Sequence, residues 1–149
     1  MYTEYISSPI GTIRIDSDGC AIMGIQRVGH AGKSNGDALT QQCAKEMAAY
    51  FQGDLKCFSV PTSAAGTDFQ KSVWKAMTKI RLGDTKTYGE LAKEIGKPKA
   101  IRAVGTACGK NPLLIVQPCH RVIGSNGALG GFAAGIRAKN ILLALEQVA

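Results

Sequence analysis

Residues 87–109 read TYGELAKEIGKPKAIRAVGTACG, and the punctuation of this stretch decides the fold of the second half of the chain. Thr87 and Glu90 form a capping-box pattern, which predicts a short helix over YGELAKEI that stops at Gly96. A second helix is predicted to begin at Pro98, because proline is tolerated in the first helical turn. Two short helices joined by a glycine-containing turn are typical of a helix-turn-helix, and an ordinary helical hairpin has the same pattern.

The second predicted helix separates small residues from polar ones. Small side chains recur at positions i, i+3, i+4 and i+7 of one face, which can therefore pack closely. On the other side, Arg102 lies near the start of the helix that would contact DNA in a helix-turn-helix. The small residues are Ala100, Ala103, Val104 and Ala107, and the polar residues outside this face are Lys99, Arg102 and Thr106.

The positive charge of the chain is concentrated in the same half. The net charge of the 149 residues is +7, but residues 1–67 carry five Lys or Arg against six acids, a balance of −1. Residues 68–149 carry thirteen against five, a balance of +8. Such a half is either a solvated surface or a site for a polyanion such as nucleic acid, whose neutralised phosphates release counterions. Charge alone leaves both interpretations open, and the helix-turn-helix pattern favours DNA.

The first 66 residues predict a small α+β domain. Two segments have the alternation and turn residues of strands, and a third apolar segment is predicted as a further short strand. Asp37 can cap a helix that runs to Gln52 and is closed by Gly53. The predicted strands are TIRID (12–16), CAIMGIQRV (20–28) and CFSVP (57–61), and TSAAG (62–66) is the predicted linker.

Residues 67–149 predict a second, mainly helical domain. Thr67 and Gln70 repeat the capping-box pattern and open a helix over DFQKSVWKAMTKIRL. Its apolar residues fall on one face, so Trp74 is expected in the core rather than on a ligand platform. We therefore predict the α+β class, with a small N-terminal α+β domain (1–66) followed by a mainly helical domain (67–149) that contains the helix-turn-helix. The apolar face comprises Phe69, Val73, Trp74, Met77 and Ile80.

The cysteine content favours a reducing compartment. The five cysteines include no CxxC pair, so neither a disulfide framework nor a zinc site is predicted. The start, MYTEYISSPIG, has no basic segment followed by an apolar run, so we expect no signal peptide and no membrane span, and a cytoplasmic location. His30 is expected to be a loop residue. Four cysteines, Cys20, Cys43, Cys57 and Cys108, are expected to be small buried hydrophobes.

The fifth cysteine stands in IVQPCHRV (115–122), directly before one of the two histidines of the chain. A thiol with a pKa of about 8.5 is a good nucleophile only when a base or a positive charge promotes its deprotonation. His120 is a candidate base for Cys119, although neighbouring side chains of an extended segment point to opposite faces. The histidine would then reach the sulfur through a turn or a bridging water, with Glu146 orienting its ring. From the spacing alone, the pair is either a reactive site or two buried side chains.

Five segments between residues 67 and 146 resemble the O6-alkylguanine-DNA alkyltransferases in order and spacing. PCHRV is the signature of that family when it follows the R-A-V-G helix and N-P, whereas residues 1–66 fit the family's smaller N-terminal α+β domain only loosely. The resemblance implies repair of double-stranded DNA containing O6-alkylguanine, by one irreversible transfer of the alkyl group to Cys119. The segments are TDFQKSVW, GDTKTYGELA, PKAIRAVGTACGKNP, IVQPCHRVIGSNGALGG and LLALE.

The resemblance also implies a role for each residue of the site. Cys119 would attack the alkyl carbon and keep it as a thioether, so that each chain repairs one lesion. His120 would take the thiol proton through a water, with Glu146 orienting its ring. Asn111 would brace the turn that carries the cysteine, and Tyr88 would donate a hydrogen bond to the guanine. This chemistry requires no metal and no dissociable cofactor.

On the DNA side, the resemblance implies a monomer that enters through the minor groove and flips the damaged nucleotide out of the helix. Arg102 would fill the place of the flipped nucleotide. Phe132 stands where the family most often has tyrosine, and alanines follow where serine and glycine are common. The expected DNA-binding residues are Tyr88, Lys99, Arg102, Ala103, Gly105 and Thr106, and the expected substrate pocket comprises Val122, Phe132, Ala133 and Ala134.

Three other classes of protein share part of this pattern. A non-catalytic sensor of alkylated bases replaces the acceptor cysteine, which is present here as Cys119. A helix-turn-helix regulator does not explain PCHRV or Glu146. A Cys-His hydrolase needs turnover on an acyl substrate and an oxyanion site, neither of which the sequence specifies.

Overall fold

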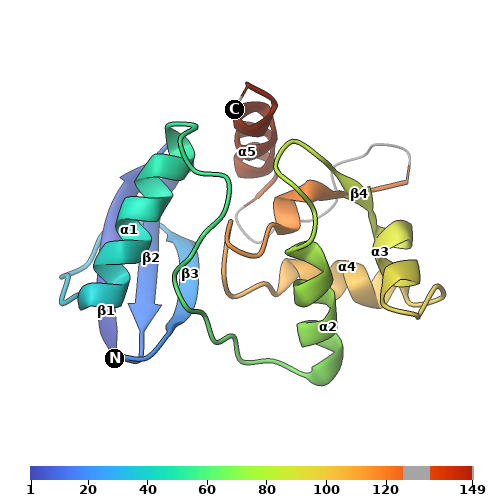
Figure 1. The fold of residues 1–149 in the computed structure, drawn as a ribbon, viewed down its shortest axis with the longest axis horizontal. Helices are drawn as coiled ribbons and strands as arrows, with labels where there is room; N and C mark the ends of the chain where they lie inside the picture. The colour runs from blue at the N-terminus through green and yellow to red at the C-terminus, as the bar shows by residue number, and fades with distance from the viewer. Residues whose placement is uncertain (126–134, 149) are drawn as a thin grey trace.

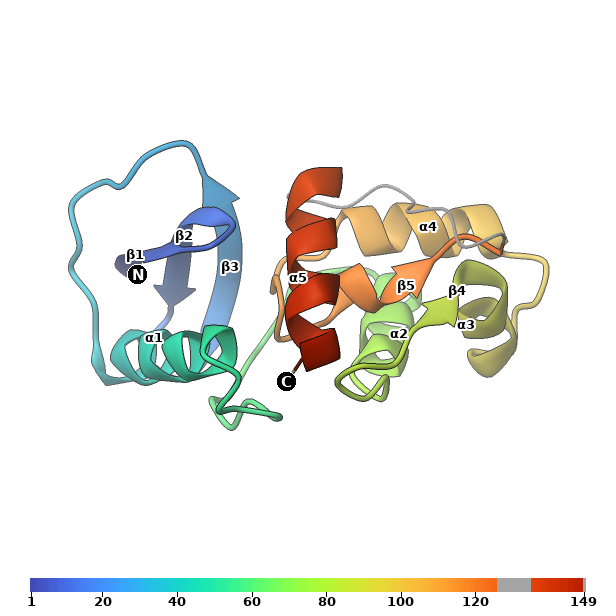
Figure 2. The same cartoon turned by 90° about the horizontal axis from the view of Figure 1, so that it is seen from above.

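A computed structural model describes residues 1–125 and 135–148 of the chain. Two parts lie side by side, a three-stranded sheet with one helix and a group of helices (Figure 1). We call them the sheet part (residues 2–51) and the helical part (residues 68–148). The last helix, α5 (Ile136–Val148), stands on the side of the helical part that is nearest the sheet (Figure 2). The predicted α+β class, with a small sheet region before a mainly helical one, is confirmed.

The sheet is an antiparallel meander of β1 (Tyr2–Ser8), β2 (Gly11–Ser17) and β3 (Ile22–Val28). Two of these strands confirm the predictions made from TIRID and CAIMGIQRV. No strand is predicted from the sequence at β1. Its side chains are mostly half-buried and do not alternate between a buried and an exposed face. Ile13 and Ile15 of β2 are fully buried and form the apolar face of the sheet.

The predicted strand CFSVP is wrong. The backbone N–H groups of Ser59 and Val60 donate to the carboxylate of Glu46, at 2.8 and 3.3 Å, instead of to a neighbouring strand. Nearby, Thr62 forms an isolated parallel bridge with Ile22. A side chain of the sheet part thus satisfies the backbone of this segment and keeps it irregular.

Helix α1 (Ala38–Phe51) covers one face of the sheet (Figure 1). Asp37 caps it as predicted, and its side chain accepts a hydrogen bond from the backbone N–H of Thr40 at 2.9 Å. Gly53 follows the helix with a φ of +81°, which suits glycine. The buried residues of the helix lie on the side that faces the sheet: Thr40, Cys43, Met47 and Tyr50.

The helical part begins with the predicted capping box of Thr67 and Gln70, and the predicted box of Thr87 and Glu90 opens its second helix. A two-stranded parallel pair, β4 with β5, is found only in the structure. The elements are α2 (Asp68–Met77), β4 (Lys86–Thr87), α3 (Tyr88–Glu94), α4 (Ile101–Gly109), the 3₁₀ helix η1 (Cys119–Arg121), β5 (Val122–Ile123) and α5.

Helix α4 differs from its prediction at its start and on its buried face. The chain makes a turn in which the N–H of Ala100 donates to the carbonyl of Lys97 at 2.9 Å, so Pro98 occupies a turn position and the helix begins at Ile101. Ala103 is exposed rather than packed. The buried face comprises Val104, Ala107 and Cys108. This face packs against α2 and α3, as the second helix of the predicted pair should.

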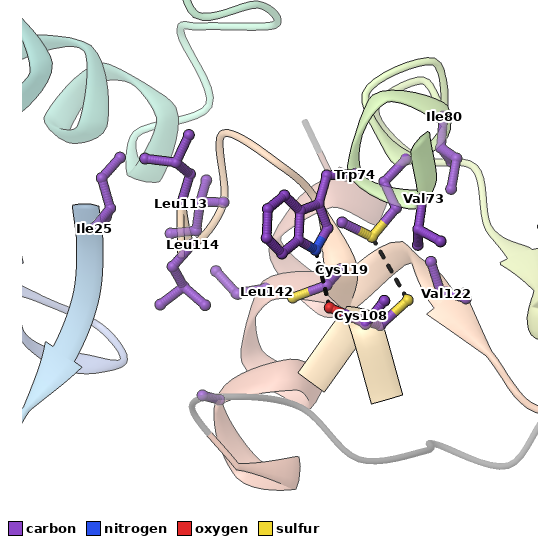
Figure 3. Packing of buried hydrophobic residues seen from close by; sticks show 14 of the residues in the cluster. Ile25, Val73, Trp74, Ile80, Cys108, Leu113, Leu114, Cys119, Val122 and Leu142 are labelled. Carbon is purple, nitrogen blue, oxygen red and sulfur yellow. Dashed lines mark hydrogen bonds between the residues drawn. The ribbon is translucent and has the colours of Figure 1, made fainter. Parts of the chain in front are cut away.

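Trp74 lies in the core, as predicted, with 2% of its surface exposed. Its indole Nε1 donates to the carbonyl of Ala107 at 2.9 Å and so ties α2 to α4 (Figure 3). Cys119 lies among the same buried side chains. The helix pair and the cysteine therefore share one packed core.

The loop of residues 111–118 joins the two parts just before Cys119. The N–H of Ile25 in β3 donates to the carbonyl of Pro112 at 2.8 Å, and the N–H of Leu114 donates back to the carbonyl of Ile25 at 3.1 Å. Leu113 and Leu114 are buried beside Ile25 (Figure 3). The sheet edge thus fixes the segment that leads into the cysteine.

Candidate active site

Cys119 begins the 3₁₀ helix η1 and is 2% exposed. The side-chain amide of Asn111 donates to the Cys119 sulfur at 3.2 Å and to the carbonyl of Gln117 at 2.6 Å. Its oxygen accepts from the N–H of Leu113 at 3.0 Å. One asparagine side chain therefore contacts both ends of the turn and the sulfur.

The backbone before the cysteine is tightly bent. Ile115 has a φ of 72°, unusual for a β-branched residue, and the N–H of Val116 donates across it to the carbonyl of Leu114 at 2.8 Å. A second tight turn follows, where the N–H of Cys119 donates to the carbonyl of Gln117 at 2.8 Å. Strained backbone of this kind persists where surrounding contacts over-determine it, often at functional sites.

Cys119 and His120 lie in a helical turn and not in an extended segment, which corrects the geometry assumed from the sequence. Successive side chains of a 3₁₀ helix are separated by about 120° around its axis, because it has about 3 residues per turn. The objection that neighbouring side chains face opposite ways therefore does not apply to this pair.

Glu146 of α5 is the centre of a buried hydrogen-bond network. Its Oε2 lies 2.5 Å from Nε2 of His120 and accepts from the hydroxyl of Tyr50 at 2.5 Å. Arg121 donates from Nε to Oε1 at 2.8 Å and from its Nη2 to Oε2 at 3.1 Å. Burial opposes ionisation, but the donors on the carboxylate outweigh it and lower the pKa of Glu146 to about 2.

The network sets the tautomer of His120. Its imidazole is fully buried, and burial lowers its pKa below the ordinary value although the Glu146 carboxylate opposes the shift. The ring is therefore neutral at pH 7 and carries one proton. Because the ionised carboxylate only accepts, that proton lies on Nε2 and leaves Nδ1 with the lone pair that can take a proton.

Lys139 of α5 belongs to the site although sequence reasoning missed it. Its side chain is fully buried, and Nζ donates to the carbonyl of Val122 at 2.6 Å. Burial lowers the pKa of Lys139, while the Cys119 and Cys108 thiols raise it. The spacing held a signal, because Lys139 lies seven residues before Glu146 and so falls on the same face of a helix.

Tyr88 is the first residue of α3, and its ring lies 5.9 Å from Nζ of Lys139. Burial and the nearby Cys108 and Cys119 thiols raise its pKa to about 12, so the hydroxyl stays protonated and can donate. A hollow of about 630 Å³ opens at this point, lined by Tyr88, Ile101, Arg102, Gly105 and Thr106. The structure thus brings Tyr88 beside three of the predicted DNA-binding residues.

Most of the predicted DNA-binding residues are exposed on the outer side of α4 or just before it. Arg102, Ala103 and Thr106 are exposed, and so is Lys99 just before the helix. Val122 is fully buried in β5 and reaches the site through its carbonyl. The other predicted pocket residues, Phe132, Ala133 and Ala134, lie outside the described residues.

The remaining cysteines divide into two groups. Cys43 and Cys108 are buried as expected, and burial raises the pKa of each to about 12. Cys20 and Cys57 are exposed, so the expectation of burial is wrong for them, because both lie in irregular surface segments.

Among residues 1–125 and 135–148, no group of three or more His, Cys, Asp or Glu side chains is placed to hold a metal ion. No helix in the described part of the chain is long and apolar enough to cross a membrane.

Residues 68–148 match the family model of the 6-O-methylguanine DNA methyltransferase DNA-binding domain, and residues 1–64 match that of the ribonuclease-like domain of the same family. The chain therefore belongs to the 6-O-methylguanine DNA methyltransferase family. This confirms the resemblance seen in the sequence, and it extends to the first 64 residues, which resembled the family only loosely.

Relatives match over nearly the whole chain. A methylated-DNA–protein-cysteine methyltransferase of Methanosarcina acetivorans is 43% identical over 157 residues, which cover 98% of each chain. One from Haemophilus influenzae is 40% identical, over 99% of this chain and 87% of its own. The crystal structure of Mycobacterium tuberculosis OGT in complex with DNA is 40% identical with a TM-score of 0.91, over 99% of this chain and 94% of that one. The predicted class of enzyme, a DNA-repair methyltransferase that alkylates its own cysteine, is confirmed at the level of the family.

Proposed function

We propose that this chain repairs DNA by transferring the alkyl group of O6-alkylguanine to the sulfur of Cys119, which stays alkylated. The observation that carries the proposal is the buried arrangement of Cys119, His120 and Glu146, in which a carboxylate holds the imidazole of the residue next to the thiol. Asn111 adds a hydrogen bond to the sulfur that stabilises a thiolate.

In the proposed reaction, the thiolate of Cys119 attacks the alkyl carbon on O6. An S–C bond forms and the C–O6 bond breaks, with its electron pair leaving on the guanine. Nδ1 of His120 takes the thiol proton through a bridging water, and Glu146 stabilises the imidazolium that results. Tyr88 donates a hydrogen bond to the departing guanine. Since a thioether has no easy leaving step, each chain reacts once.

Lys139 adds positive charge to this site. Burial lowers the pKa of Lys139 and the Cys119 thiol raises it, and a nearby cation favours the thiolate that the reaction needs. Nζ of Lys139 also lies near the ring of Tyr88, at 5.9 Å. We therefore add Lys139 to the residues expected from the sequence.

The DNA side of the proposal rests on the exposed face of α4 and the basic half of the chain. A thiol cannot reach O6 inside a duplex, so the alkylated nucleotide must be flipped out at a cost of a few kcal/mol. Arg102 fills the vacated place from the minor-groove side, and the other exposed residues of the face contact the backbone. Phosphate contacts supply most of the affinity, with strong salt dependence.

The organisation of the chain follows from the same proposal. Residues 1–66 form the N-terminal domain and residues 67–149 the DNA-binding and alkyl-acceptor domain, a division supported by the two family matches on either side of residue 66. The chain acts as a monomer on double-stranded DNA. Its five free cysteines support a reducing, cytoplasmic location.

Intact-protein mass spectrometry tests the proposal. The wild-type chain is incubated with a duplex containing O6-methylguanine, beside Cys119→Ser and the matched control Cys108→Ser. Cys108 is also buried near the site, but its raised pKa keeps it a thiol. We expect a gain of one methyl group per chain in the wild type and in Cys108→Ser, mapped to Cys119, and none in Cys119→Ser.

The other classes of protein give different results in the same experiment. Lesion binding without a mass gain in the wild type would indicate a sensor and contradict the proposal. Repeated turnover of an ester or peptide substrate would indicate a hydrolase. A methyl group on Cys108 would agree with the methyltransferase family but would identify Cys108, and not Cys119, as the acceptor.

A further inference from the structure

Tyr50 connects the sheet part to the active site. It lies in the last turn of α1, 2% exposed, and its hydroxyl lies 2.5 Å from Oε2 of Glu146, a residue 96 positions further along the chain. α5, which carries Glu146, stands on the side nearest the sheet (Figure 2). The sheet part thus places a polar side chain directly on the carboxylate that holds His120.

The hydroxyl donates and the carboxylate accepts. Burial and the charge of Glu146 both raise the pKa of Tyr50, so the phenol keeps its proton. The oxygen that accepts this bond, Oε2, also accepts from His120. Nη2 of Arg121 donates to the same oxygen at 3.1 Å, and the three donors that share it divide its negative charge and limit where each can lie.

The Tyr50 side chain is packed on its ring, and the helix that carries it is packed on the sheet. The Tyr50 ring makes an edge contact with Phe51, with centroids 5.2 Å apart, and lies 5.8 Å from the ring of Phe58. Its helix packs on the sheet through Cys43 and Met47. The packing of α1 on the sheet therefore sets where the hydroxyl meets the carboxylate, while the ring contacts with Phe51 and Phe58 are apolar.

We propose that Tyr50 is a positioning residue for alkyl transfer, which makes the sheet part a component of the active site. It acts through Glu146: by holding Oε2 and sharing its charge, it sets the orientation and the basicity of His120. This inference rests on the proposed alkyl transfer to Cys119.

Tyr50→Phe removes the hydroxyl and keeps the ring. Without this donor the carboxylate offers more negative charge to His120, which favours the imidazolium. The other charged groups that face the ring, Arg121 and Lys139, oppose a positive charge there and are unchanged. We expect the methyl transfer rate at pH 7 to fall by about tenfold, and the acidic limb of the rate profile to move to higher pH.

The experiment compares the wild type, Tyr50→Phe and Phe58→Leu. Phe58→Leu disturbs the packing beside Tyr50 but keeps its hydroxyl. Single-turnover methyl transfer from an O6-methylguanine duplex is measured across pH, with affinity for undamaged duplex as a second quantity. NMR titration of the His120 imidazole gives a direct readout of its protonation, and the dispersion of the methyl signals in the same samples shows that each variant is folded.

The expected result is a slowed rate, a shifted acidic limb and earlier protonation of His120 in Tyr50→Phe alone, with unchanged DNA affinity. A Tyr50→Phe profile that superposes on that of the wild type would overturn the role of Tyr50. An equal shift in Phe58→Leu would show that Tyr50 acts through packing alone and not through its hydroxyl. A wild-type chain that gains no methyl group would instead remove the proposed function, and this inference with it.

Discussion

The sheet part and the helical part each place a glutamate at the centre of several hydrogen bonds, and the two differ in their donors. Glu46 of α1 accepts from the backbone of Ser59 and Val60 and from the side chains of Ser59 and Gln42. These donors are neutral and close in sequence, and they fasten an irregular segment to a helix.

Glu146 accepts from the adjacent His120 and Arg121 and from Tyr50, which are ionisable, buried and distant from it in sequence. A carboxylate with such partners controls where protons lie. The comparison teaches that the number of hydrogen bonds does not identify a functional carboxylate, whereas the chemistry and burial of its donors do.

Matched glutamine variants give the largest expected difference between the two carboxylates. Glu146→Gln removes the charge that stabilises the imidazolium of His120, so single-turnover methyl transfer should fall by about 10²–10⁴-fold, the usual contribution of general base catalysis. Glu46→Gln should leave the rate within about twofold, because Glu46 touches no reacting group. A comparable loss of rate in both variants would break the comparison.

The pH dependence of stability gives a second, smaller difference. The pKa of Glu146 falls from an ordinary 4.5 to about 2 in the folded chain, so its contribution is fully present above pH 4.5 and is lost as the pH falls toward 2. The pKa of His120 is also lowered by folding, so its contribution likewise disappears in acid, below an ordinary 6.5. Both groups therefore make the folded chain less stable as the pH falls.

Urea unfolding at pH 7 and pH 3 measures this difference. The wild type should lose on the order of 2 kcal/mol of unfolding free energy between the two pH values through Glu146. That loss should be absent from Glu146→Gln and present in Glu46→Gln. An equal pH dependence in all three chains would show that Glu146 is not held as an ionised group.

Local chemistry made much of the fold predictable. The capping residues Asp37, Thr67 and Thr87 lie where the sequence puts them, because a cap depends on the few residues that follow it. The helix start predicted at Pro98 is wrong because proline suits both the first turn of a helix and a tight turn. The hydrogen bond from Ala100 to Lys97 that forms the turn cannot be read from the sequence.

Some residues of the candidate site could likewise be predicted from the sequence, and others could not. Cys119 and His120 are adjacent and form a motif, so the sequence points to them directly. Glu146 is a candidate acid on the last predicted helix, the resemblance to a family implies that it orients His120, and the structure has a hydrogen bond between the two. Tyr50 could not be predicted, because tertiary packing brings it to Glu146 across 96 residues. The spacing of Lys139 places it on the same helix face as Glu146, but its burial depends on packing that the sequence does not show.

The smallest expected effect is on DNA binding, when one exposed lysine is removed from the helical part or from the sheet part. Lys99, exposed beside α4, and Lys45, exposed on α1, carry the same charge on opposite parts of the molecule. If the basic half binds phosphates, Lys99→Ala removes one contact, which should weaken duplex binding several-fold at low salt and reduce the slope of log K against log salt by about 0.9. Lys45→Ala should change neither quantity, since Lys45 lies in the half of the chain whose charge balance is −1. Affinity titrations of both variants at several salt concentrations measure the slopes. Equal losses for the two lysines would mean that the net charge of +7 attracts DNA without a defined face, and the sheet part would then share in binding as well as in catalysis.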